Sequence, residues 1–131
     1  MKNKMKKILA SLTLGTVAIA CVPVVNAASS VSGNVGGYST QGTLTDSSDK
    51  VASATAMTSY SGYSGAIVTG VTLNWGLDGK VGTKRNSASG NRTHVIATAA
   101  SDSYGSVLLS ATGSHLVSAG SNTWSDSTYI N

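Results

Sequence analysis

The sequence contains no phenylalanine and no glutamate, and it has one proline and one cysteine among 131 residues. Cys21 and Pro23 both lie near the N-terminus, so residues 28–131 contain neither residue type. The absence of cysteine from that part excludes a disulfide framework and a thiolate metal site there. The absence of glutamate, together with a total of two histidines, leaves few groups for general acid–base catalysis. We therefore expect a non-enzymatic protein with no catalytic residues, no metal and no cofactor.

The first 27 residues have the pattern of an export signal. A basic head precedes an uncharged, mostly apolar run over residues 8–20, then Pro23, then small residues near position 27. The run is shorter than the roughly 20 apolar residues that a membrane-spanning helix needs. The pattern predicts a signal peptide cleaved between Ala27 and Ala28, which makes residues 28–131 one secreted domain without a transmembrane segment. The basic head consists of Lys2, Lys4, Lys6 and Lys7.

Cys21 supports an alternative form of export. Residues 17–21 resemble a bacterial lipobox, in which the signal is cut before the cysteine and the cysteine is lipidated. Two features oppose this interpretation: Ala18 stands where leucine is usual, and residues 22–25 are apolar where a polar tether is expected. Simple secretion is the preferred prediction, and a lipoprotein anchored through Cys21 is the alternative.

The net positive charge of the chain comes from the predicted signal peptide. The formal net charge is +4, from nine Lys and Arg against five acids, all of them Asp. Four of the nine basic residues lie in the first 27, so residues 28–131 carry equal numbers of basic and acidic side chains. The high isoelectric point is therefore no sign of nucleic-acid binding.

Residues 28–131 alternate Ser and Thr with apolar residues, which is typical of β-strands. Asp78-Gly79 is the clearest turn signal, because a two-residue type I′ hairpin needs positive φ at both positions. Residues 86–91 have the composition of a polar loop. We expect an all-β fold, a small antiparallel β-sandwich of about seven or eight short strands with a thin core. The expected strands cover 38–45, 51–60, 66–75, 80–85, 92–100, 107–117 and 123–130.

The two histidines are interpreted as structural or solvent-facing. Strict alternation places His115 on one face with Val107, Leu109, Ala111 and Val117, which predicts a half-buried, hydrogen-bonded side chain. His94 falls on the face opposite its apolar neighbours and is expected in solvent. Ser, His and Asp are all present, but no Gly-x-Ser-x-Gly motif joins a strand to a helix, so the pattern gives no hydrolase prediction.

Two groups of side chains are candidates for surface contacts. Most basic residues of the mature part fall in one short segment, which suits an anionic wall polymer or an anionic lipid surface. The same charges on an edge strand would instead oppose self-association through strand pairing. Tyr63, flanked on both sides by Ser and Gly, is the best candidate for an exposed ring that stacks on sugars. The basic candidates are Lys80, Lys84, Arg85 and Arg92.

Three short segments of the C-terminal part carry a resemblance: Arg92-Thr93-His94, Ser118-Ala119-Gly120 and Thr123-Trp124-Ser125. Together they resemble lactococcin 972-type bacteriocins, over less than a third of the chain. The resemblance implies an exported, cysteine-free β-sandwich that acts at a cell-wall precursor. The leading expectation remains a secreted β-sandwich protein of the bacterial cell surface that interacts with other cells or polymers. The alternatives are a bacteriocin-like toxin and a small carbohydrate-binding module.

Overall fold

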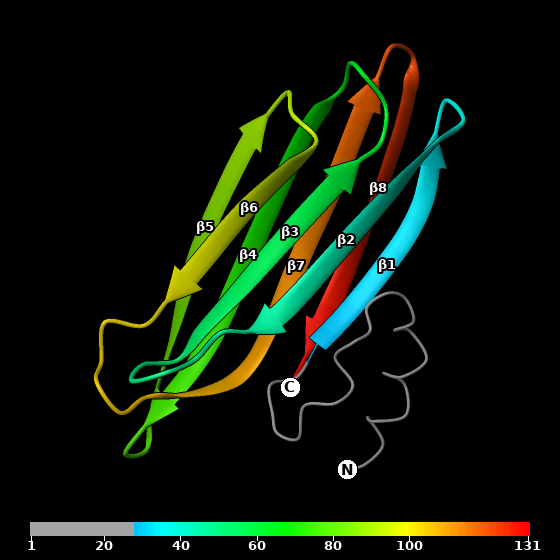
Figure 1. Ribbon diagram of the computed structural model, residues 1–131. Helices are drawn as coiled ribbons and strands as arrows, with labels where there is room; N and C mark the ends of the chain where they lie inside the picture. Colours follow the sequence, from blue (N-terminus) through cyan, green and yellow to red (C-terminus); the bar gives the residue numbers. More distant parts are fainter. Residues whose placement is uncertain (1–27) are drawn as a thin grey trace.

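A computed structural model describes residues 28–131, which form eight strands in two four-stranded antiparallel sheets (Figure 1). Sheet A has the order β1-β2-β3-β6 and sheet B the order β5-β4-β7-β8. The sheets pack face to face, with β1 against β8 along one side and β6 against β5 along the other. The all-β sandwich predicted from the alternation is therefore confirmed. The strands are β1 Ala28–Val35, β2 Tyr38–Asp46, β3 Ser53–Tyr60, β4 Ala66–Leu77, β5 Lys80–Gly90, β6 His94–Ala100, β7 Val107–Ala119 and β8 Asn122–Ile130.

Tight turns with positive φ close the hairpins. Asp78 and Gly79 join β4 to β5 with φ values of 52° and 80°, as the sequence predicted. Gly36 and Gly37 join β1 to β2 in the same way, with φ values of 59° and 88°. Backbone with positive φ at both central positions twists in the sense that the flanking strands need. The hairpin between β1 and β2 was not among the strands expected from the sequence.

The interior consists of two apolar clusters. The larger one contains mostly alanine around Leu44, Leu73 and Ile130, and Trp75 packs against it. The smaller one surrounds Tyr60 and Ile67, and Trp124 packs against it. Small side chains therefore fill much of the interior, and the two tryptophans supply bulk beside the clusters.

Two expectations about strands were wrong. Residues 86–90 were expected in a loop, but they continue β5 and pair with residues 67–71 of β4. The long central strand β4 needs backbone partners along its length, and a polar edge strand supplies them. In β7, Val107 and Leu109 are exposed instead of facing the core with His115. A register shift between Asn74 and Trp75 leaves one extra residue on β7, so Leu108 packs inward in their place.

Candidate functional site

A buried polar layer separates the two apolar clusters. His115 on β7 is 1% exposed, and both of its ring nitrogens have partners. Thr58 Oγ1 on β3 lies 2.8 Å from Nδ1, and Thr128 Oγ1 on β8 lies 2.9 Å from Nε2. Thr69 on β4 extends the network, with its Oγ1 2.7 Å from Thr58 Oγ1 and 3.2 Å from the carbonyl oxygen of Val95. The layer therefore links sheet A to sheet B through side-chain hydrogen bonds.

Two glycines make room for the imidazole ring. A Cβ atom at Gly42 on β2 would lie 2.3 Å from His115 Cγ, and one at Gly113 would lie 3.1 Å from Nε2. The sequence predicted a half-buried histidine, and the ring is instead fully buried because these positions lack side chains. Burial lowers the pKa of His115 from 6.5 to about 4, and the nearby Asp126 carboxylate opposes this only in part. His115 is thus a neutral, fully partnered structural residue. His94, at the start of β6, is exposed as predicted.

The four basic candidates do not converge on one surface. Lys80 begins β5, and Arg92 follows its end, so they lie at opposite ends of an edge strand. Lys84 Nζ lies 2.6 Å from Asp102 Oδ2, in an ion pair whose acid is 83% exposed. Arg85 is the next residue along the strand and points to the other face. The structure therefore separates these charges instead of gathering them into a basic patch.

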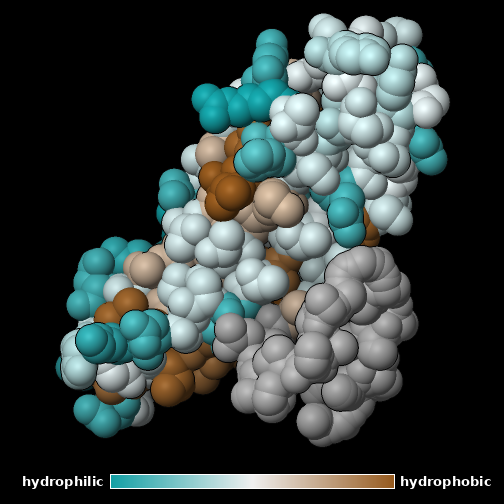
Figure 2. All heavy atoms as spheres, viewed as in Figure 1, coloured by the Kyte–Doolittle hydropathy of each residue, from teal (hydrophilic) through white to brown (hydrophobic). Residues whose placement is uncertain are grey.

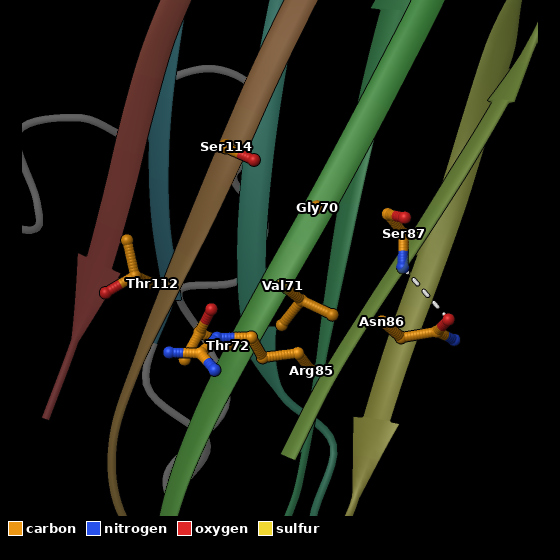
Figure 3. Close-up of a pocket in the computed structure, with 8 residues that line it drawn as sticks. All are labelled: Gly70, Val71, Thr72, Arg85, Asn86, Ser87, Thr112 and Ser114. Carbon is orange, nitrogen blue, oxygen red and sulfur yellow. Dashed lines mark hydrogen bonds between the residues drawn. The ribbon is translucent and has the colours of Figure 1, made fainter. Parts of the chain in front are cut away.

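Arg85 lies beside a shallow groove on the outer face of sheet B, which we call the Arg85 groove (Figure 3). The groove has a volume of about 480 Å³. In Figure 3 the Arg85 side chain crosses β4 and brings its guanidinium close to Thr72. Outward-facing residues of three adjacent strands line it: Gly70, Thr72, Arg85, Ser87, Thr112 and Ser114. Val71 and Asn86 also border the groove, but the side chain of Val71 is buried in the core and that of Asn86 donates to the carbonyl oxygen of Thr98 on β6. Arg85 was a candidate from the sequence, but the groove was not predicted, because it forms only when β5, β4 and β7 pair.

Three tyrosines meet at the end of the sandwich where β1 turns into β2, and we call this region the tyrosine end. Tyr63 is 95% exposed and Tyr38 is 43% exposed, and their ring centroids lie 6.1 Å apart in an edge-to-face arrangement. Tyr38 contacts the buried Tyr60 in a similar geometry, with centroids 6.2 Å apart. The sequence predicted that Tyr63 is exposed. It missed Tyr38, whose place after the Gly36-Gly37 turn was the available signal.

The loops of the tyrosine end are held together by hydrogen bonds and close packing. The backbone amide of Ser39 donates to Ser61 Oγ over 2.9 Å, and the amide of Ser61 donates to the Ser39 carbonyl over 3.0 Å. A Cβ atom at Gly62 would lie 2.3 Å from the ring of Tyr60, so the loop lies directly on that ring. A Cβ atom at Gly65 would lie 2.9 Å from the same Tyr60 ring, so the segment that presents Tyr63 is anchored on both sides of the exposed ring.

The remaining sequence predictions fall at or beyond the N-terminal boundary of the described residues. Ala28 is the first residue of β1, whereas Cys21 and Ala27 lie outside the described residues. Within residues 28–131, no three His, Cys, Asp or Glu side chains gather where a metal ion would fit. Across the same strands and loops there is no helix long and apolar enough to cross a membrane.

Comparison with known proteins found no matching family model, no similar curated protein and no similar solved structure.

Proposed function

We propose that residues 28–131 act as an exported, non-enzymatic binding domain that contacts carbohydrate chains at a bacterial surface through the tyrosine end. The observation that carries this proposal is the Tyr38–Tyr63 pair, in which a ring that is 95% exposed is held against a second, half-exposed ring. Exposed aromatic rings favour contacts with partners that combine apolar faces and hydroxyl groups, as sugar rings do.

The surroundings of the pair support a sugar ligand. Ser39 and Ser61 directly follow Tyr38 and Tyr60 in the sequence, and their exposed hydroxyl groups, 3.2 Å apart, offer donors and acceptors to sugar hydroxyls. Anchored loops lower the entropy that the site loses on binding. Elsewhere, the outer face of sheet A is rich in Ser and Thr, and Figure 2 shows mostly pale and teal side chains on this side of the molecule, with small separate brown patches. His115 is fully occupied inside the core, which supports a binding role over a hydrolytic one.

Binding to insoluble cell-wall polysaccharide tests this proposal. We expect Tyr63→Ala and Tyr38→Ala each to weaken co-sedimentation with purified wall material at least about tenfold, the loss of one stacked ring. Tyr104→Ala is the matched control, because Tyr104 is 74% exposed but lies in the loop between β6 and β7, at the opposite end of the sandwich. Equal losses in all three variants, or no loss in any, would contradict a tyrosine-end site. Growth inhibition by the purified wild-type domain would instead favour the bacteriocin-like alternative.

Export is a separate part of the proposal and has its own measurement. Mass spectrometry of material secreted by the producing cells should give an N-terminus at Ala28. An N-terminus at Cys21 with added acyl mass would show the lipid-anchored form instead. Retention of the intact chain inside the cells would contradict both forms of export.

A further inference from the structure

We propose that the Arg85 groove binds the phosphate group of a phosphodiester-linked wall polymer, such as a polyol or sugar phosphate chain. This site is independent of the tyrosine end, because it lies on the outer face of sheet B, in the middle of β4. It extends the proposed surface role to a second ligand chemistry.

The shape of the groove comes from a glycine in the centre of a sheet. Gly70 pairs with Ser87 on β5 and with Ser114 on β7, so the middle of this row across three strands has no side chain. A Cβ atom at Gly70 would lie 2.6 Å from Ser114 Oγ, so even one methyl group would begin to fill the hollow. The next row contains Arg85, Thr72 and Thr112, which supply the remaining walls. The hollow is thus bordered by hydroxyl groups and by one guanidinium.

The charge in the groove matches an anion. All five acids of the chain lie within residues 28–131, and the one ion pair found there joins Lys84 to Asp102, so Arg85 has no carboxylate partner. A guanidinium offers paired N–H donors that fit two oxygens of a phosphate, and neighbouring hydroxyl groups donate to the others. The hydroxyl-rich lining also suits the polyol or sugar units on either side of a phosphodiester.

The same arrangement disfavours a lipid surface. The outward-facing positions of sheet B carry no basic side chain besides Arg85 within the described strands. Attraction to an anionic membrane grows with the number of basic residues near its surface, so a single arginine holds a membrane weakly. A polymer with one phosphate per repeating unit needs only one arginine in the groove to contact one of its phosphates.

The test uses the secreted domain and two probes, inorganic phosphate and poly(glycerol phosphate), followed by amide NMR and titration calorimetry. Both probes should shift the amide signals of Gly70, Thr72 and Ser114, and the polymer should bind more tightly. Arg85→Gln and Gly70→Thr should each weaken polymer binding at least about tenfold, the first by removing the charge and the second by filling the hollow. Arg92→Gln is the matched control, because it removes one exposed charge outside the groove, and it should leave binding unchanged.

Several results would overturn the proposal. Equal losses of polymer binding in Arg85→Gln and Arg92→Gln would show that the polymer is attracted by net charge and not by a specific site. Unchanged binding by Gly70→Thr would show that the polymer does not occupy the groove. Equal binding of a phosphate-free glycan would show that the phosphate is not recognised. Binding to phosphatidylglycerol vesicles but not to the polymer would identify a membrane surface instead. Tyr63→Ala should retain the response to inorganic phosphate, so failure at one site is distinguishable from failure at the other.

Discussion

Acidification should destabilise this fold through His115, and the size of the effect follows from its burial. The folded-state pKa is about 4, against 6.5 for an unburied histidine. Between these values the unfolded chain binds a proton that the folded protein excludes, so the free energy of unfolding falls as the pH falls. Each pKa unit corresponds to about 1.4 kcal/mol, so roughly 3 kcal/mol of stability is lost between pH 6.5 and pH 4. Above pH 6.5 this contribution is complete and independent of pH.

Urea denaturation at a series of pH values from 7.5 to 4.5 measures this loss. The window lies above the ordinary carboxylate pKa, near 4, so histidine dominates it. The exposed His94 supplies the control, and His94→Gln should keep the wild-type pH dependence. A triple variant, Thr58→Val, His115→Leu and Thr128→Val, replaces the hydrogen-bonded partners together and leaves no orphaned hydroxyl at either ring nitrogen. It should flatten the pH dependence. A wild-type midpoint that does not move across this window, or a triple variant that still loses stability, would refute the assignment.

Three further predictions concern packing, strand register and the edge of sheet B. Gly42→Ala should cost about 1–3 kcal/mol of stability, because its Cβ atom would lie 2.3 Å from His115 Cγ, and thermal unfolding measures this. Val71→Asp should prevent folding or cost about 3 kcal/mol or more, whereas Thr72→Asp on the outer face should cost about 1 kcal/mol or less; equal effects in circular dichroism melts would contradict the register of β4. Neutralising the basic side chains on and after the edge strand β5 should raise oligomerisation in light scattering, and a variant that stays monomeric would contradict their protective role. These side chains are Lys80, Lys84, Arg85 and Arg92.

The fold class could be predicted from the sequence because alternation is strong where one strand face is buried. In β4, Ile67, Thr69, Val71 and Leu73 are all buried, as the period of two required. The Asp78-Gly79 hairpin was equally local, since its backbone conformation depends on those two residues. The length of β5 was underestimated because its second half has a loop-like composition. Those residues are held in a strand by pairing with β4, which is a tertiary effect that local propensity does not contain.

The surface sites were predictable only residue by residue. Tyr63 was found from its Ser-Gly surroundings, but its partner Tyr38 lies in another hairpin and joins it only after β2 and β3 pair. Arg85 was grouped with Lys84 because they are neighbours in sequence. Successive residues of a strand point to opposite faces, so this grouping placed two side chains together that the fold separates. The Arg85 groove depends on three paired strands, and no single segment carries its signature.

The polar layer explains how a chain poor in large apolar residues specifies one register. Slipping a strand by one residue turns its side chains to the opposite face, and a core built largely from alanine distinguishes such arrangements weakly. The hydrogen bonds of His115 distinguish them strongly, because a slipped β3 or β8 would leave a ring nitrogen buried without Thr58 or Thr128. Gly42 adds a steric condition, since another residue at that register position would collide with the ring. We infer that this buried layer contributes more to the uniqueness of the fold than to its net stability, because an apolar layer of similar volume would bury no polar groups. Because the buried layer fixes the register, the outer faces and the strand ends are free to carry Ser, Thr, Tyr and Arg side chains for surface contacts.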